Sequence, residues 1–434
     1  MDIAVIASLI MVASLVIMLV MGMPIGIGIG VSSTLAMIAI LPFDSGLMTC
    51  AQKMFTGINS FPLMAIPFFI LAGNIMNNGG IATKLVNCAK LLTGKLPAPL
   101  AQTNILANMM FGSISGSGTA AAAAIGGTMS PIMVKEGYSK DFIAAVNIAS
   151  APTGQLIPPS NTLIVYATVA GSVSVAALFM AGYIPGILWG LAIMVIAGFM
   201  GIKRGYKGAY KVPFPVAMKI VLDALPSIFM IVIIIGGILA GVFTATEAAA
   251  VSVAYVLLLS ACYRTIKLKD LPKIFIDSAI TTTIVLFMIG VSSIMSWVMA
   301  YTMIPTYIAN AVLDISENPI VILLLINIIL LLVGTFMDPT PAVLIFTPIF
   351  LPICQSFGMD PVHFGIMMVF NLCIGTITPP VGVILFTGCR VTGINIEKVI
   401  KTLIPYFIGI FVILMLTTYV EPFSMAIPRA LGLV

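Results

Sequence analysis

Gly154-Gln155-Leu156-Ile157-Pro158-Pro159 is matched much later in the chain by Gly375-Thr376-Ile377-Thr378-Pro379-Pro380, and these two stretches decide the fold. The glycines and both prolines are 221 positions apart, as 375 minus 154 gives for the glycines. Three further pairs have the same separation: Thr119 with Thr340, Pro131 with Pro352, and Gly137 with Gly358. A constant separation over so much of the chain predicts an internal repeat of two homologous halves.

The composition is typical of a membrane protein. Of the 434 residues, 61% are hydrophobic and 8% are charged, whereas soluble domains carry about 25% charged residues. Apolar runs long enough to cross about 30 Å of hydrocarbon as helices recur from end to end. The first run, 3–22, lacks a basic segment before it, so we expect a membrane span rather than a cleaved signal peptide. We therefore predict an all-α polytopic membrane protein.

The apolar runs divide into spans and interrupted stretches. The predicted spans are 3–22, 24–42, 62–78, 141–170, 176–202, 220–241, 245–263, 275–298, 363–390 and 402–420, of which 141–170 and 363–390 are expected to be broken. Two more stretches, about 100–134 and about 318–354, look too short or too interrupted to cross once, so we predict re-entrant helical hairpins there. The stretches 43–61 and 80–98 are more polar and are expected to be interfacial helices or packed loops.

The basic residues give an orientation. With the N-terminus outside and each hairpin returning to its starting side, 17 of the 19 Lys and Arg residues lie inside, and only Lys53 and Arg429 lie outside. This is the positive-inside pattern, and it places both termini on the outer side. The connection 299–318, predicted to be outside, carries no basic residue.

The repeat is predicted to be inverted. Residues 1–202 form the first half, 203–219 a basic inner linker, and 220–434 the second half. Each half has five crossings and one hairpin, and an odd number of crossings makes the second half enter from the opposite face. The two hairpin apices, 112–119 and 334–341, would then face each other near the middle of the membrane.

The breaks at these apices and at the Pro-Pro pairs are candidate sites. Ser117 and Asp338 are expected to cap the returning helices, with Pro339 in a first turn. A Pro-Pro pair frees backbone carbonyls, and these with hydroxyl groups would make an oxygen-only sodium site, while helix N-termini face an anionic substrate. A simple proline kink is the alternative for any one break. Asp338, at membrane depth, is a candidate sodium ligand or proton-linked carboxylate.

Other residues favour structural roles or exclude other functions. Thr244 and Glu247 have the spacing of a capping box, and Arg390 fits interfacial snorkelling better than substrate binding. The six scattered cysteines predict neither disulfides nor a metal site. A single histidine and a lone intramembrane acid argue against an enzyme, and the lack of a continuous polar stripe argues against a channel.

The motifs resemble those of one family, the large membrane subunits of tripartite ATP-independent periplasmic (TRAP) transporters. The resemblance covers essentially the whole chain. It rests on the stretches 113–117, 155–160, 334–338, 378–382 and 241–250. Ala245 is a departure, because the family often has proline there.

The resemblance implies an elevator mechanism and sodium-driven symport in the inner membrane of a bacterium. It also implies a small four-helix membrane subunit and a periplasmic substrate-binding protein as partners. By motif position, the implied first sodium site is Ser115, Gly154, Ile157 and Pro159, the second is Asp338, Thr340, Gly375 and Val381, and substrate would lie near Ser117, Ser160, Asn161 and Thr162. Among family substrates, sialic acid is the first expectation, with C4-dicarboxylates and sugar acids as alternatives. Export by a protein of the same fold also remains an alternative function.

Overall fold

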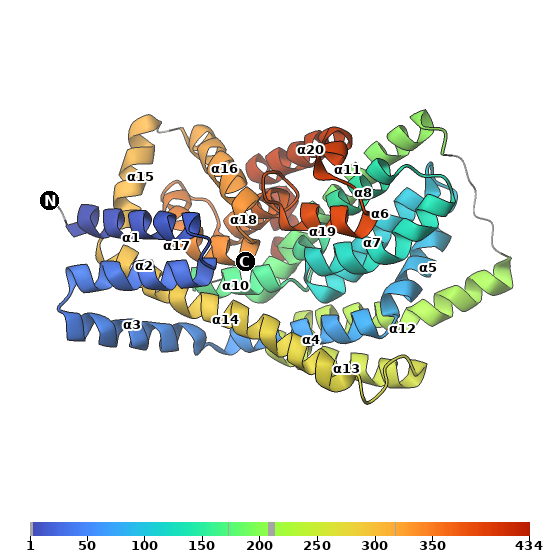
Figure 1. Cartoon of the computed structure of the whole chain (residues 1–434), viewed down its shortest axis with the longest axis horizontal. Coiled ribbons are helices and arrows are strands. Elements are labelled where there is room, and N and C mark those ends of the chain that lie inside the picture. Colours follow the sequence, from blue (N-terminus) through green and yellow to red (C-terminus); the bar gives the residue numbers. More distant parts are fainter. Residues whose placement is uncertain (1–2, 172, 207–212, 317) are drawn as a thin grey trace.

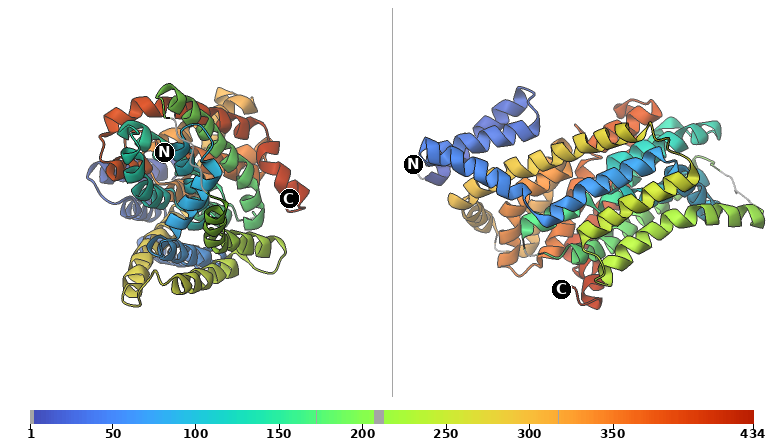
Figure 2. Two further views of the ribbon diagram at one scale, coloured as in Figure 1. Left: turned by 90° about the vertical axis from the view of Figure 1, so that its right-hand side faces the viewer. Right: turned by 90° about the horizontal axis from the view of Figure 1, so that it is seen from below.

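The computed structural model describes residues 3–171, 173–206, 213–316 and 318–434, and in these ranges all regular structure is helical (Figure 1). One group of helices packs around α14, and we call it the α14 group. Its members are α1 Ile3–Val20, α2 Ile25–Ile40, α3 Phe43–Ile58, η1 Phe61–Met64, α4 Ala65–Asn78, α12 Phe214–Leu239, α13 Ala245–Tyr263 and α14 Leu271–Tyr301. Figure 2 shows α4, α13 and α14 running side by side.

The second group contains both predicted hairpins, and we call it the hairpin group. Its members are α6 Pro99–Ser115, α7 Gly118–Lys135, α8 Lys140–Ser150, α9 Thr153–Leu156, α10 Asn161–Ala170, α11 Val175–Lys203, α16 Pro319–Phe336, α17 Pro339–Ser356, α18 Pro361–Gly375, α19 Val383–Thr392, α20 Ile396–Tyr419 and α21 Pro422–Ala430. Two further helices touch both groups: α5 Ile81–Thr93 and α15 Ile304–Ile315.

The helix breaks lie where the repeat predicts them. In each hairpin two residues separate the arms, 116–117 between α6 and α7 and 337–338 between α16 and α17. The predicted broken spans are α8, α9 and α10 in the first half and α18 and α19 in the second. Both Pro-Pro bonds are cis.

The arms of the second hairpin are longer than the sequence analysis expected. Eight helices are long and apolar enough to span a membrane, and they include both arms of the second hairpin, α16 and α17, with 18 residues each. Each arm is therefore long enough to cross by itself, whereas the stretch 318–354 was predicted to be too short or too interrupted to cross once. Its break after Phe336 is confirmed, and its return to the starting side of the membrane stays a prediction.

Short polar side chains begin many of the helices. Each of these side chains accepts a backbone N–H of the first turn, which would otherwise lack a partner. They are Ser117, Ser160, Ser174, Thr244, Asn318, Asp338 and Asp360. The capping box of Thr244 and Glu247 is confirmed, with Thr244 N donating to Glu247 Oε2 at 2.8 Å.

Three connections differ from the prediction. The connection 299–318 contains α15, and α21 follows the last predicted span. The linker 203–219 is shorter than predicted because α12 begins at Phe214, and its residues 207–212 lie outside the described ranges. The helix α15 was not predicted. It starts 223 positions after α5 (304 minus 81), so it corresponds to α5 in the internal repeat, and the repeat could have predicted it.

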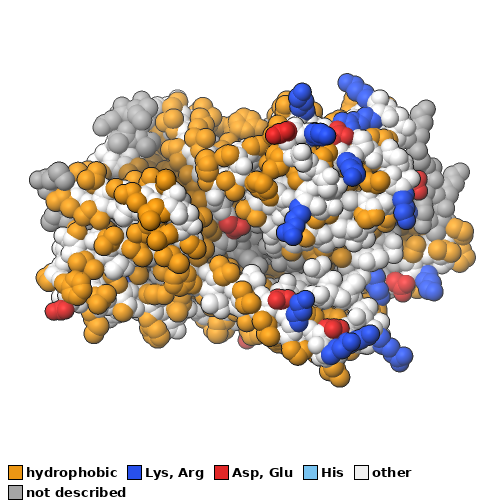
Figure 3. Space-filling view, viewed as in Figure 1, with side chains coloured by type: hydrophobic (Ala, Val, Ile, Leu, Met, Phe, Trp, Pro, Cys, Tyr) orange, Lys and Arg blue, Asp and Glu red, His pale blue; other side chains and the backbone are white. Residues whose placement is uncertain are grey.

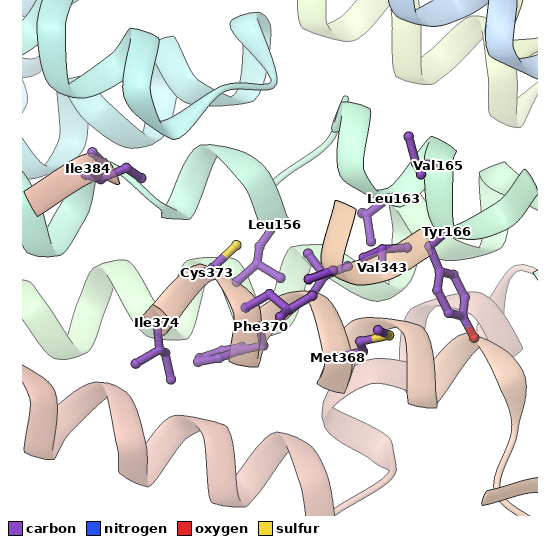
Figure 4. Packing of buried hydrophobic residues seen from close by; sticks show 14 of the residues in the cluster. Leu156, Leu163, Val165, Tyr166, Val343, Met368, Phe370, Cys373, Ile374 and Ile384 are labelled. Atoms are coloured by element: carbon purple, nitrogen blue, oxygen red, sulfur yellow. The ribbon is translucent and has the colours of Figure 1, made fainter. Parts of the chain in front are cut away.

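Lys and Arg side chains gather over the right-hand half of the face shown in Figure 3, where α5 to α8, α12 and α13 lie, while hydrophobic side chains cover the left. This uneven distribution agrees with the positive-inside pattern in the sequence. The buried core follows the broken helices, and Figure 4 shows Phe370 and Cys373 of α18 next to Leu156 of α9. All six cysteines are free.

Candidate functional site

A pocket of about 380 Å³ lies between the α14 group and the tips of the hairpin group. On one side it is lined by α4 and by the middle of α14, through Ile66, Ile70, Gly73, Asn74, Thr281, Ile284, Val285 and Met288. Its polar lining on the other side is Ser115, Ser117, Thr119, Gln155, Asn161, Thr162, Asp338 and Thr340. One wall is thus mainly apolar and the opposite wall mainly polar.

Three helix N-termini meet at the polar wall. Thr119 lies in the first turn of α7, Asn161 and Thr162 in that of α10, and Thr340 in that of α17. The N-terminal end of a helix carries a partial positive charge and favours a bound anion. None of the described lining residues is Lys or Arg, so among the lining groups these helix ends are the ones that favour an anion.

The capping residues of two of these helices also line the pocket. The Ser117 hydroxyl accepts the N–H of Ala120 at 3.3 Å, and Asp338 Oδ1 accepts the N–H of Thr340 at the same distance. The predicted capping roles of Ser117 and Asp338 are confirmed. Ser117 Oγ also lies 3.0 Å from Thr119 Oγ1.

The first broken helix holds its polar groups close to the hairpin tip. Gly112 packs against Gly154 backbone to backbone, and a methyl group on Gly116 would lie 3.2 Å from the carbonyl oxygen of Pro159. In the described structure, neither the Ile157 nor the Pro159 carbonyl accepts a hydrogen bond. Both carbonyls lie at the Pro-Pro break itself. The pair was predicted to free carbonyls one turn earlier, and of those the Gln155 carbonyl accepts the Ser160 hydroxyl.

The second broken helix repeats this arrangement. Gly375 packs on the backbone of Gly334, and the N–H of Gly382 donates to the carbonyl of Thr335 at 3.1 Å. Within the described ranges the carbonyl of Val381 accepts no hydrogen bond, and its side chain is 38% exposed. Gly375 and Val381 therefore lie next to the end of α16. The α16 residues that this region contacts, Gly334 and Thr335, come a few positions before Asp338 in the chain.

Asn161 offers an unused acceptor. Its Oδ1 atom is buried and has no hydrogen-bond partner among the described residues. Leaving a buried acceptor unpaired costs about 1–3 kcal/mol, so this enclosed oxygen is a local cost at the start of α10. Asn161 was predicted to contact the substrate; it lines the pocket, and the contact stays a prediction.

The pocket brings together half of the twelve predicted site residues: Ser115, Ser117, Asn161, Thr162, Asp338 and Thr340. The other six do not line it: Gly154, Ile157, Pro159, Ser160, Gly375 and Val381. Ser160 is instead the cap of α10, donating to the carbonyl of Gln155 at 2.5 Å. The exposed Arg390 also lies outside the lining.

Sequence reasoning missed four polar lining residues: Asn74, Thr119, Gln155 and Thr281. Thr119 and Gln155 belong to the repeated motifs, so their position next to a break was a usable signal. Asn74 and Thr281 lie inside long apolar helices, and no pattern marks them. Asn74 donates to Ser278 of α14 at 2.8 Å and thereby links α4 to α14.

A family model described as "Tripartite ATP-independent periplasmic transporter, DctM component" matches residues 12–423. The chain belongs to this family. It is therefore a multi-pass membrane component of a TRAP transporter, as its motifs and its helical fold predicted.

Relatives of this TRAP large subunit have similar sequences over nearly its whole length. It is 52% identical over 420 residues to YgiK of Salmonella typhimurium, covering 97% of each chain. It is 38% identical to the sialic acid TRAP transporter large permease protein SiaM of Vibrio cholerae, over 94% of this chain and 95% of that one. It is also 41% identical to the isethionate TRAP transporter permease protein DctMQ of Oleidesulfovibrio alaskensis, over 94% of this chain but 64% of that longer one.

The fold is shared with a solved transporter of distant sequence. The YdaH transporter of Alcanivorax borkumensis superposes with a TM-score of 0.61 at 13% identity, covering 88% of this chain and 89% of that one. At this identity the likeness concerns the fold alone.

Proposed function

We propose that this TRAP large subunit carries a small organic anion across the membrane, driven by sodium, and that the pocket of about 380 Å³ is its substrate site. The observation that carries the proposal is the convergence of three helix N-termini on a pocket without Lys or Arg among its described lining residues. Such a site attracts an anion through helix dipoles and neutral donors. Its volume lies within the usual range for small-molecule sites, about 300–1,000 Å³.

Sodium coupling is supported by the free carbonyls near the pocket. Those of Ile157, Pro159 and Val381 accept no hydrogen bond in the described structure, and Asp338 supplies a carboxylate. Hard cations prefer such oxygen ligands. A bound sodium ion next to Asp338 would also reduce the repulsion between this carboxylate and an anionic substrate, which gives a physical reason for the two to bind together.

We further propose that transport is an elevator movement of the hairpin group against the α14 group. The pocket lies between the two groups, and its α14 side is mainly apolar, so a substrate held by the polar wall could move with the hairpin group. The pocket faces the middle of α14, a helix long enough to span the membrane. The two halves would be inverted repeats, with both termini outside the bacterial inner membrane.

The family name implies a system of three components. We propose that the partners are a small four-helix membrane subunit and a periplasmic binding protein that delivers the substrate. The exposed apolar helices of the α14 group, among them α1, α3 and α12, could meet either lipid or the small subunit.

For the substrate we propose sialic acid first. The pocket offers many neutral polar groups and one acid, which suits a singly charged acid with several hydroxyl groups better than a dicarboxylate. One relative is named for sialic acid, others for isethionate and for C4-dicarboxylates. These two classes are therefore the competing substrates in the test.

The test reconstitutes the chain with its small subunit and binding protein in liposomes. Labelled sialic acid, isethionate and succinate are offered under an inward sodium gradient, with an equal potassium gradient as the control. We expect uptake of one acid, dependent on sodium. Uptake that persists with potassium alone would disprove sodium coupling, and no uptake of any organic anion would overturn the proposed function.

A further inference from the structure

We propose that Gln155 binds the anionic end of the substrate through its side-chain Nε2 group, and that Cys373 is the positioning residue that orients this amide. The inference rests on the proposed function, because it assigns a further residue to the proposed substrate pocket. Gln155 is on α9, a single helical turn between two breaks, and Cys373 is on α18.

Gln155 is held at the pocket wall. Its side chain lines the pocket although the residue is only 7% exposed, and its backbone carbonyl accepts the Ser160 hydroxyl at 2.5 Å. The residue therefore has little freedom to move away. A buried amide in such a place needs partners for both its oxygen and its nitrogen.

The amide oxygen has its partner. The Cys373 thiol donates to Gln155 Oε1 with a sulfur–oxygen distance of 3.3 Å. The same oxygen lies at the start of α7, where a methyl group on Gly118 would be 3.3 Å from it. The N–H groups at a helix start favour an acceptor. Both neighbours therefore favour the oxygen, and the nitrogen faces the other way.

The amide nitrogen has no hydrogen-bond partner among the residues that the structure describes. Within the described residues no hydrogen bond from Nε2 is recorded, and Nε2 is not among the fully enclosed unpaired atoms. Because the residue lines the pocket, this donor reaches the pocket space. It is ready to donate to a bound acceptor.

The acceptor that suits this donor is a carboxylate. An N–H group cannot ligate a sodium ion, and the side-chain oxygen is directed towards the Cys373 thiol and the start of α7. With no Lys or Arg among the described lining residues, neutral donors are needed to select the substrate anion. Gln155 adds such a donor next to the helix start of α7.

The test compares uptake kinetics of Gln155→Leu, Gln155→Glu and Cys373→Ala. A lost hydrogen bond to a charged group corresponds to roughly a tenfold or larger change in binding, so Gln155→Leu should raise KM about tenfold with little change in the maximal rate. Gln155→Glu should be worse because its carboxylate repels the substrate. Cys373→Ala should raise KM less, by about threefold, because the amide is then free to turn.

Two controls separate positioning from packing. In the Gln155→Leu background, Cys373→Ala should have no further effect on KM, since residues that act through one another are not additive. Cys389→Ala, at another buried cysteine outside the pocket lining, should leave KM unchanged. An unchanged KM in Gln155→Leu, or additive effects of the two substitutions, would overturn the proposal.

A spectroscopic readout needs no transport. The infrared S–H stretching band of Cys373, isolated by subtracting the Cys373→Ala spectrum, should shift to higher frequency in Gln155→Leu as its acceptor is lost. If the wild type takes up no organic anion, the proposed function fails and substrate binding by Gln155 fails with it. The band shift still decides whether Cys373 holds the amide, and an unshifted band would overturn that part.

Discussion

Gly112 of the first hairpin and Gly154 of the first broken helix lie in direct backbone contact. A methyl group on Gly112 would lie 2.5 Å from the α carbon of Gly154, and Gly334 and Gly375 form a corresponding contact in the second half. Real side chains essentially never come so close, so only glycine fits at Gly112, Gly154 and Gly375, while an added carbon at Gly334 would lie 3.1 Å from the α carbon of Gly375. Each contact joins a hairpin to a broken helix next to the pocket.

The first prediction is that Gly154→Ala disrupts this contact. Forcing an extra methyl group into a packed site costs about 1–3 kcal/mol, so the melting temperature in detergent and the uptake rate should both fall. Gly127→Ala is the matched control, because Gly127 is in α7 with no atom within 4 Å of the added carbon. Equal effects of the two substitutions would contradict the packing explanation.

The second prediction separates the charge of Asp338 from its role as a cap. Asn is as good a helix cap as Asp, so Asp338→Asn should keep the melting temperature while sodium-driven uptake falls at least about tenfold, as the loss of one charged ligand predicts. Asp360→Asn is the control. Asp360 caps α18 in the same way, accepting the N–H of Val362 at 2.7 Å, and it is not a pocket residue. Wild-type uptake in Asp338→Asn would remove its charge from the mechanism.

The third prediction concerns the start of α13. Ala245 is the first residue of α13, and Thr244 before it has φ −70° and ψ 163°, a conformation that a following proline allows. Ala245→Pro should therefore stabilise the protein by about 0.4–1 kcal/mol and leave KM unchanged. Ala248→Pro is the contrast, because the Ala248 N–H bonds to the Thr244 carbonyl at 2.9 Å and would be lost. Thermal melting of both variants decides.

The fourth prediction uses Trp189 as a reporter. Its indole N–H donates to the carbonyl of Ala149 at 2.9 Å, close to the first break, and its ring packs on Phe370. Trp297 is the other tryptophan. In Trp297→Phe, the emission of Trp189 should change when sodium is added, because an ion bound at the break alters the field at Ala149. No change at saturating sodium, in protein that still transports, would show that the ion does not bind next to this break.

Much of the fold could be read from particular residues. The Pro-Pro pairs placed both broken helices, and the glycine- and serine-rich apex at 112–119 placed the first hairpin within a few residues. Asp338 before Pro339 placed the start of α17, because a capping side chain and a proline at the first position fix a helix start locally. The helix α15 was missed in a stretch treated as a connection, although the repeat implied it through α5.

The sequence by itself determined the matched pair of breaks and their local chemistry, because proline, glycine and capping side chains act on the backbone within a few residues. Only the tertiary structure decided which polar groups share one pocket. Asn74 and Thr281 come from long apolar helices, and Gln155 meets Cys373 across 218 positions of the chain. Such contacts depend on how helices from distant parts of the chain pack together, and no local pattern records that packing.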